Sequence, residues 1–186
     1  MNSVDFSVII PQRNSLDSLT RLFDSIPFSD KIEVILVDNS FEPISIEDVK
    51  TNRPFQLFHS VPQSFAGGAR NIGIDNAHGK WLIFADADDF FTPQAFDIFY
   101  SHLDDEADLI YFKSDSVYDD TLEPSDRNVL FNGYIDDYVS GKLSEMGVRL
   151  SYLVPWGKMV RKDLVLQNSI RFDEVLAAND VYFSTL

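Results

Sequence analysis

WLIFADADD, residues 81–89, decides the fold, because it joins a continuous apolar run to a cluster of acidic side chains. The run Trp81–Ala85 does not alternate polar with apolar residues, which is typical of a strand buried on both faces of a sheet. It ends in three carboxylates within four positions, Asp86, Asp88 and Asp89. Carboxylates this close repel one another unless a positive charge lies among them. The stretch therefore predicts a buried strand whose carboxyl end meets a cation.

Further short apolar runs extend this pattern into an α/β sheet. They are Phe6–Ile10, Glu33–Val37 and Leu109–Phe112, with a weaker run at Phe55–His59. Between the runs, the sequence predicts helices over residues 16–26, 69–77 and 93–103, capped by Ser15 before the first and by Thr92 before the third. Strands that alternate with helices in this way form a mostly parallel central sheet flanked by helices, with right-handed crossovers.

Composition limits the class of partner. The 186 residues, 45% of them hydrophobic, suffice for one full domain but not for two large ones. With 15 basic and 30 acidic residues the formal charge is −15, which argues against nucleic acid or an anionic membrane surface as the main partner. The absence of cysteine excludes disulfides, thiolate metal sites and cysteine nucleophiles. The sequence shows no signal peptide and no run near the ~18 apolar residues that span a bilayer. We expect a cytoplasmic protein, with peripheral association at the inner face of the membrane as the alternative.

The carboxyl edge of the sheet is the expected ligand site, as in other open α/β sheets. Pro11, Asp38 and residues 86–89 each follow a predicted strand and so project at this edge. Two aspartates separated by one residue can hold a divalent cation together, because hard oxygen ligands suit Mg²⁺ and Mn²⁺. The alternative is a solvated acidic turn that caps the next helix. An EF-hand calcium loop is disfavoured by its missing glycine, and a phosphatase with an aspartyl nucleophile by the mid-chain position and by Phe90.

Three further motifs each allow a functional and a structural interpretation. Gly67 and Gly68 predict a turn that leads into the helix carrying Arg70, where backbone N–H groups and a guanidinium suit a diphosphate; the alternative is a packing turn with a surface arginine. Asp38, with the asparagine after it, suits the edge of a nucleobase, but such residues are also ordinary turn formers. Asp180 precedes an apolar run and is placed either to cap a helix or to act as a base.

Taken in order, five strings resemble the glycosyltransferases of the GT-A fold, and among them the large inverting family 2. The strings are SVIIPQRN (7–14), VILVDNS (34–40), GGARNIGI with GKWLIFADADD (67–89), WGKMVRK (156–162) and FDE with NDVYFS (172–184). The resemblance covers nearly the whole chain. It implies a Rossmann-like half that binds a nucleotide-sugar donor, residues 1–113, and an acceptor-side half, residues 114–186.

By matching position, the resemblance also implies roles for individual residues. The implied nucleotide-sugar-binding residues are Pro11, Arg13, Asp38, Gly68, Arg70, Asp86 and Ala87. Among them Pro11 and Asp38 would contact the nucleobase, Arg70 the base or the diphosphate, and Asp86 the ribose. Asp88 would hold Mn²⁺ or Mg²⁺ against the diphosphate, and this cation would relieve the repulsion within DADD.

The sequence departs from the family pattern at two positions, one on the acceptor side and one on the donor side. Asp180 falls where the family places its catalytic base, but Asn179 stands before it where glutamate is usual. Asp38 is likewise followed by Asn39, where a second aspartate is usual. Residues 156–158, Trp-Gly-Lys, match a segment that lies near the acceptor in such enzymes.

The implied function is metal-dependent, inverting transfer of a sugar from a nucleotide sugar, preferably a UDP-sugar, to a hydroxyl of a glycan or lipid-linked acceptor in surface or capsular polysaccharide assembly. The alternatives are an inactive nucleotide-sugar-binding fragment and a phosphatase with Asp86 as nucleophile. Family members normally continue past the position of Leu186, so we expect a truncated acceptor-side half that exposes Tyr182 and Phe183. We also expect the chain to bind a donor better than it transfers sugar.

Overall fold

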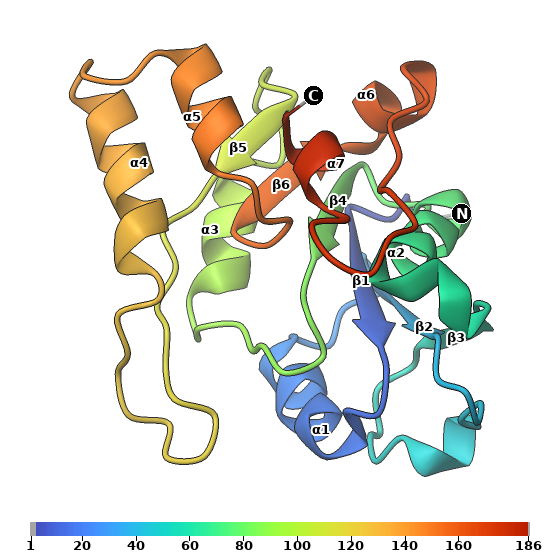
Figure 1. Ribbon diagram of the computed structural model, residues 1–186. Helices are drawn as coiled ribbons and strands as arrows, with labels where there is room; N and C mark the ends of the chain where they lie inside the picture. Colours follow the sequence, from blue (N-terminus) through green and yellow to red (C-terminus); the bar gives the residue numbers. More distant parts are fainter. Residues whose placement is uncertain (1–2, 186) are drawn as a thin grey trace.

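A six-stranded sheet forms the centre of the molecule. The structure, a computed structural model, describes residues 3–185 (Figure 1). The strands lie in the order β3-β2-β1-β4-β6-β5. They are β1 (Phe6–Gln12), β2 (Ile32–Asp38), β3 (Gln56–His59), β4 (Trp81–Phe84), β5 (Leu109–Tyr111) and β6 (Lys158–Arg161). The helices are α1 (Leu16–Ser25), α2 (Phe65–Asn76), α3 (Ala95–Ser101), α4 (Val129–Val139), α5 (Glu145–Ser151), α6 (Lys162–Gln167) and α7 (Val181–Thr185), with short 3₁₀ turns η1 (Ile46–Asp48) and η2 (Pro62–Ser64).

The sheet is mostly parallel, as the continuous apolar runs predict. β1 is parallel to β2 and β4, and β2 is parallel to β3. β6 runs antiparallel to both of its neighbours, β4 and β5. All five predicted apolar runs are strands, so the α/β fold with a central sheet flanked by helices is confirmed. The reversed strand β6 is not among the apolar runs that the sequence predicts as strands.

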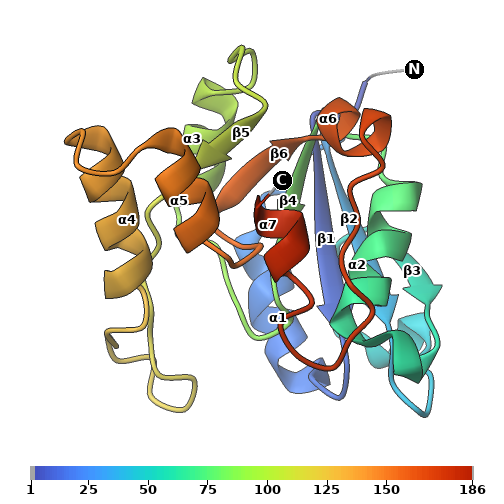
Figure 2. The same cartoon turned by 45° about the horizontal axis from the view of Figure 1, so that its top comes forward.

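Helices cover both faces of the sheet (Figure 2). One apolar cluster joins alternate residues of β1, such as Val8 and Ile10, to α1 and α3. A second cluster joins Ile9 on the opposite face of β1 to α2, α6 and α7. Because both faces of β1 are covered in this way, every one of its residues is buried. The core therefore consists of two layers, and its central strands are held rigidly from both sides.

Two predicted helix starts are wrong. α2 begins at Phe65 instead of residue 69, so Gly67 and Gly68 lie in its first turn and not in a turn before it. These positions are crowded: a Cβ at Gly67 would overlap the backbone O of Asp173, and one at Gly68 would overlap the side chain of Ser64. Glycine thus allows close packing here, although it lowers helix propensity.

The other misplaced start is that of α3, which begins at Ala95 with Gln94 as its N-cap. The N–H of Ala95 bonds to Thr92 O at 3.0 Å, so Thr92 opens a turn that precedes the helix and does not cap it. The chain just before this turn is held against α1, where Phe91 N donates to Ser25 Oγ at 2.9 Å.

The predicted exposure of the last aromatic pair is half right. Tyr182 is exposed, but Phe183 is buried at 6% exposure. The Phe183 ring stacks on Phe172 with centroids 3.9 Å apart and meets the edge of Phe84 at 5.3 Å. α7 is therefore docked on the sheet by this ring.

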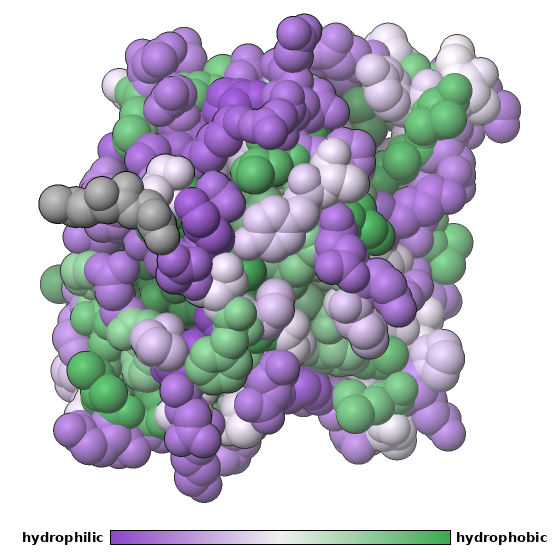
Figure 3. Space-filling model, turned by 180° about the vertical axis from the view of Figure 1, so that it is seen from behind, coloured by the Kyte–Doolittle hydropathy of each residue, from purple (hydrophilic) through white to green (hydrophobic). Residues whose placement is uncertain are grey.

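Outside these layers, α4 and α5 pack on each other at one side of the molecule (Figure 1). Apolar side chains of α4, such as Val129 and Val139, are largely exposed. The face opposite to that of Figure 1 mixes hydrophilic and hydrophobic residues (Figure 3). Within residues 3–185, no helix has the length and apolar character needed to cross a membrane.

Candidate functional site

A cleft of about 360 Å³ opens at the carboxyl edge of β1, β2 and β4. The parallel register sets this edge, because Gln12 at the end of β1 is level with Asp38 at the end of β2. Six of the predicted site residues line the cleft: Pro11, Arg13, Arg70, Asp86, Ala87 and Asp88. It is also lined by Gln12, Phe65, Ala66 and Leu176, for which no role was predicted, and by Ser15, Asn39 and Asn179, which the predicted motifs contain as a helix cap, as the neighbour of Asp38 and as the neighbour of Asp180. Asp38, Gly68 and Asp180 do not line the cleft, but each is within two residues of a side chain that does.

The DADD stretch forms a tight turn directly after β4. The N–H of Asp86 donates to Asp89 Oδ2 at 3.0 Å, and the N–H of Asp89 donates back to Asp86 O at 2.9 Å. Burial, with the neighbouring charge of Asp86, raises the pKa of Asp89 to about 7. Asp89 is thus used to shape the turn, and it leaves the other two carboxylates on the cleft side.

Asp88 is the residue of this turn best placed to hold a cation. It is exposed, and its carboxylate accepts no hydrogen bond from residues 3–185. Its backbone O is fixed by Arg21 Nη2 at 2.7 Å. The described residues contain no group of three or more His, Cys, Asp or Glu that could hold a metal ion together. A hard, exposed carboxylate fits Mg²⁺ or Mn²⁺ when phosphates and water complete the coordination shell.

Arg70 provides the positive charge beside the turn. It projects from α2, is 5% exposed, and Nη2 pairs with Asp86 Oδ1 at 2.5 Å. Nη1 donates to Asn179 Oδ1 at 2.8 Å, and the guanidinium lies over the Phe172 ring, 5.2 Å from its centroid. Nε is buried and has no hydrogen-bond partner within the described part of the chain. The alternative of a surface arginine is therefore wrong.

Asp38 is buried beneath the cleft, and its carboxylate organises the loop after β2. Oδ1 accepts from Ser40 Oγ at 2.7 Å and from Gln12 Nε2 at 3.3 Å, and Oδ2 accepts from Ile44 N at 3.1 Å. With these bonds in place, the cleft surface at the end of β2 is formed by Asn39. Its Nδ2 is buried and donates to no acceptor among residues 3–185, so it is available to a ligand.

Two predicted donor residues lie at the margins of this arrangement. Arg13 lines the cleft and lies over the exposed ring of Phe41, 4.9 Å from its centroid. Gly68 faces Ser64 inside the first turn of α2, and close packing is the role that the structure shows for it.

Phe65 lines the cleft in an unusual backbone conformation. Its φ is 53° and its ψ is −163°, a region that residues other than glycine rarely occupy. The cost of such a conformation is of the order of 1–3 kcal/mol. No sequence signal predicts it, since a phenylalanine ordinarily indicates a negative φ.

Asp180 stands immediately before α7, and its backbone O accepts from Ser184 N at 2.9 Å. The same position is the expected one for a helix cap and for a base, so the location alone is compatible with both. The charge of Asp180 affects the pKa of Lys158 on β6. Burial lowers the pKa of Lys158 to about 7, and the charge of Asp180 acts in the opposite direction.

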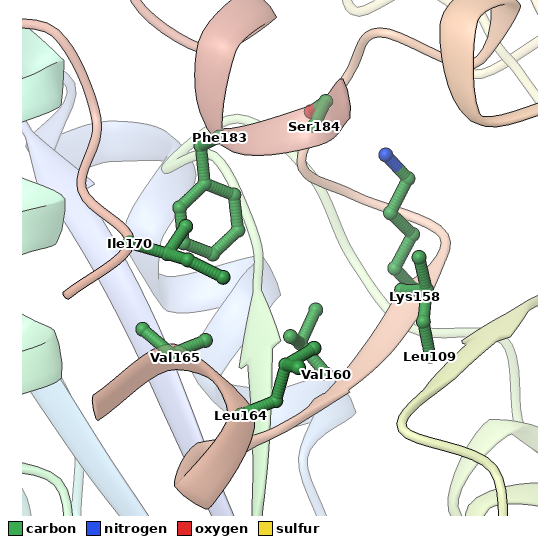
Figure 4. A pocket seen from close by; sticks show the side chains of 8 residues that line it. All are labelled: Leu109, Lys158, Val160, Leu164, Val165, Ile170, Phe183 and Ser184. Atoms are coloured by element: carbon green, nitrogen blue, oxygen red, sulfur yellow. The ribbon is translucent and has the colours of Figure 1, made fainter. Parts of the chain in front are cut away.

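Lys158 borders a second, small cavity between β6, α6 and α7 (Figure 4). The cavity has a volume of about 20 Å³, room for about one water molecule. Its other walls are apolar apart from Ser184, and Lys158 Nζ donates to Tyr152 O at 2.7 Å. This cavity is too small for a substrate, and the cleft at the carboxyl edge is the candidate site.

Sequence comparisons identify relatives of the whole described region. The model of a family described as "Glycosyl transferase family 2" matches residues 7–165. "Uncharacterized glycosyltransferase YibD" of Escherichia coli (strain K12) is 30% identical over 200 residues, which cover 100% of this chain and 57% of the relative. "Poly(ribitol-phosphate) beta-N-acetylglucosaminyltransferase TarS" of Staphylococcus aureus (strain MW2) is 25% identical, over 96% of this chain and 31% of the relative. The chain thus spans 57% or less of the length of these two proteins.

Solved structures share the fold. S. aureus TarS 1–349 in complex with UDP superposes with a TM-score of 0.73 at 22% identity, over 97% of this chain and 54% of that one. The mannosyltransferase PcManGT from Pyrobaculum calidifontis, in complex with GDP-Man and Mn²⁺, superposes with a TM-score of 0.63 at 16% identity, over 98% of this chain and 51% of that one. At these identities the likeness shows a common GT-A architecture.

Proposed function

The chain belongs to glycosyl transferase family 2, and on this premise we propose that it transfers a sugar from a nucleotide-sugar donor to a hydroxyl acceptor, with inversion at the anomeric carbon. The observation that carries the proposal is the cleft in which Arg70, Asp86 and Asp88 meet at the carboxyl edge of the sheet. This edge is where open α/β sheets bind their ligands. The chemistry at this edge suits a diphosphate: a buried guanidinium stands beside an exposed carboxylate able to hold a divalent cation.

The donor's parts correspond to different groups of the cleft. We assign the nucleobase to the ends of β1 and β2, with Pro11 and Arg13 on one side and the Asn39 amide on the other. Asp86 takes the ribose, while Arg70 and Asp88 take the diphosphate side, Asp88 through Mn²⁺ or Mg²⁺. UDP is the preferred nucleotide, because the relative TarS has been crystallised with UDP and with UDP-GlcNAc.

Asp180 is the proposed base. It takes the proton of the acceptor hydroxyl as the hydroxyl oxygen bonds to the anomeric carbon from the face opposite the diphosphate. The bond from the anomeric carbon to the phosphate oxygen breaks at the same time, and its electron pair leaves with the diphosphate. Arg70 stabilises the negative charge that develops there, since a fixed guanidinium in a buried site is already oriented toward it. A bound divalent cation supplies Lewis-acid neutralisation of the same charge.

The acceptor side is proposed on family membership. A hydroxyl of a glycan or lipid-linked acceptor, in bacterial surface or capsular polysaccharide assembly, is compatible with the activity that gives TarS its name, poly(ribitol-phosphate) beta-N-acetylglucosaminyltransferase. The corresponding location is the cytoplasm, at the inner face of the membrane where such acceptors are made.

Turnover tests this proposal. UDP-GlcNAc, UDP-glucose, UDP-galactose and GDP-mannose are incubated with the chain and Mn²⁺, and released nucleoside diphosphate is measured with and without glycan acceptors. We expect release from one donor. Asp180→Asn should lower the rate about 10²-fold or more, the usual contribution of a general base, and should leave nucleotide affinity unchanged. Asp173→Asn, a matched change of an exposed carboxylate in the same segment, should keep the wild-type rate.

Binding without turnover is the second candidate. It is favoured by one observation: Asn179 lines the cleft but Asp180 does not. Tight donor binding with equal, negligible release by the wild type and by Asp180→Asn would establish it. A phosphatase with Asp86 as nucleophile is disfavoured, because the Arg70 ion pair engages the Asp86 carboxylate.

A further inference from the structure

The segment from Asp173 to Asn179, which we call the 173–179 loop, lies along α2 between Phe172 and α7 (Figure 2). It is closed on itself by a hydrogen bond from Asp173 N to Asn179 O at 3.0 Å. Between these ends Leu176 is 78% exposed and lines the cleft. The loop thus connects the wall of the candidate donor site to the residue proposed as the base, Asp180.

The residue before the loop, Phe172, is bound through its backbone to the Asn71 side chain of α2. Asn71 Nδ2 donates to Phe172 O at 3.0 Å, and Phe172 N donates to Asn71 Oδ1 at 2.9 Å. Gly67 has no side chain, so the backbone of Asp173 can lie directly on the helix. These contacts hold the beginning of the loop against α2.

At the end of the loop, the Asn179 side chain makes one bond within the loop, from Nδ2 to Val175 O at 3.4 Å, and one bond to α2. Asn179 Oδ1 accepts from Arg70 Nη1 at 2.8 Å. The other terminal nitrogen of the same guanidinium pairs with Asp86 Oδ1. A single buried side chain therefore joins the donor side of the cleft to the residue that precedes Asp180.

The contacts of the Arg70 guanidinium restrict its orientation, so a shift of the guanidinium also shifts Asn179. It lies over the ring of Phe172, and that ring stacks on Phe183 in α7. Asn179 is neutral, so Arg70 has one carboxylate partner, Asp86, and a buried Nε without a partner in residues 3–185. This leaves positive charge unbalanced at the point where the proposed diphosphate would bind, and a buried charge gains most from a new partner.

From these contacts, and resting on the proposed function, we propose that Asn179 is a positioning residue that couples the donor site to the base. A nucleoside diphosphate in the cleft fixes Arg70, Arg70 fixes the Asn179 amide, and the amide sets the position of Asp180 at the start of α7. Asn179 itself touches neither the sugar nor the transferred proton.

Hydrogen exchange of the full chain tests the link without any ligand. Asn179→Ala removes both the acceptor for Arg70 Nη1 and the Nδ2 bond to Val175 O, whereas Asn179→Asp loses only the second of these bonds and keeps an oxygen for Arg70. Asn168→Ala is the matched control, because Asn168 is the exposed C-cap asparagine of α6 and its side-chain amide donates to Leu164 O in the preceding turn. Loss of a hydrogen bond to a charged donor should speed exchange of amides 173–180 about tenfold in Asn179→Ala, with little change in Asn179→Asp or Asn168→Ala.

The second arm repeats the exchange with UDP or GDP and Mn²⁺, and measures nucleotide affinity and donor turnover. Ligand should slow exchange of 173–180 in the wild type, and Asn179→Ala should lose most of this protection while its nucleotide Kd stays within about threefold. Its kcat should fall about tenfold with the donor KM nearly unchanged, since the lost contact positions the base and not the donor.

The outcomes separate this inference from the proposed function. If Asn179→Ala has the same exchange rates and the same kcat as Asn168→Ala, the coupling is overturned. The proposed donor site is not affected by this result. A wild-type chain that binds neither nucleotide overturns the proposed function, and the coupling with it. If the donor KM of Asn179→Ala rises while its kcat stays unchanged, Asn179 contributes to donor binding. This result also overturns its role as a positioning residue.

Discussion

Replacing Gly67 by alanine should destabilise the protein, although the same change in an ordinary helix stabilises it. Gly67 lies in the first turn of α2, where Gly→Ala normally gains about 0.5–1 kcal/mol. The added Cβ would overlap Asp173 O, and it would also stand 2.9 Å from Asp173 C and 3.2 Å from Asn179 Cβ. The overlapped atoms belong to the backbone and cannot turn aside.

The size of the effect follows from how firmly that backbone is held. Asp173 N bonds to Asn179 O, and Phe172 is bound twice to Asn71, so the loop cannot move away without breaking hydrogen bonds. Overpacking of this kind costs about 1–3 kcal/mol. After subtraction of the helix-propensity gain, the free energy of unfolding of Gly67→Ala should fall by about 1–2 kcal/mol. In a chain of this length that lowers Tm by roughly 2–8 °C.

Gly133→Ala provides the matched control. Gly133 lies within α4, and a Cβ there would meet no atom within 4 Å. This variant should gain about 0.5–1 kcal/mol. Both variants are measured by urea unfolding followed by tryptophan fluorescence, with thermal scans alongside. A Gly67→Ala chain that is stabilised as much as Gly133→Ala would refute the close contact between α2 and the 173–179 loop.

Three further predictions concern other features of the fold. At position 65, glycine should give a more stable protein than alanine by about 1 kcal/mol, the reverse of the usual order, because only Phe65 and Phe65→Ala carry a Cβ at positive φ; equal thermal stability of the two variants would contradict this conformation. Phe183→Ala should cost about 3–5 kcal/mol, whereas Tyr182→Ala at an exposed position should stay within about 0.5 kcal/mol, and similar unfolding midpoints would show that α7 is not docked. Lys158→Met should change the pH dependence of stability, because burial lowers the pKa of Lys158 from 10.5 to about 7 despite the charge of Asp180. Between these pH values the unfolded chain binds a proton that the folded chain lacks, so this group makes wild-type stability rise with pH from about 7 to about 10.5. The stability of the variant relative to wild type should therefore be highest near pH 6 and decline toward pH 10, and a difference independent of pH would contradict the shift.

The sheet could be predicted because its signal is local. Trp81–Phe84 and the other apolar runs are continuous, and continuity alone indicates burial on both faces. The common edge of Pro11, Asp38 and Asp86 then follows from parallel pairing. Six of the predicted site residues line one cleft, and those that follow β1 and β4 do so for this reason.

What could not be predicted depends on contacts between distant segments. Position 67 needs glycine, although it lies inside a helix, because the backbone of Asp173 packs directly against it. Asp173 is more than a hundred residues later in the chain. Phe183 is buried because Phe172 and Phe84 receive its ring, and neither partner is visible in its local sequence.

The site shows the same division. Asp38 was predicted as a nucleobase contact, but the loop after β2 occupies its oxygens, and Asn39 presents the available amide. Both residues stand in the same strand-end motif, so the motif located the region without deciding which side chain faces the ligand. Asn179 was visible as the neighbour of Asp180, but its bond to Arg70 required the tertiary structure.

The central claim is that the cleft at the end of β4 binds a nucleoside diphosphate through Asp88 and a divalent cation. Calorimetric titration of UDP and GDP, with and without Mn²⁺, into the wild type and Asp88→Asn tests it most directly. Asp97→Asn, a change at an exposed carboxylate in the first turn of α3, serves as control. We expect one nucleotide to bind only with Mn²⁺, with affinity lowered at least about tenfold in Asp88→Asn and unchanged in Asp97→Asn. Equal affinity in Asp88→Asn and in the absence of Mn²⁺, or no binding of either nucleotide to the wild type, would contradict the claim.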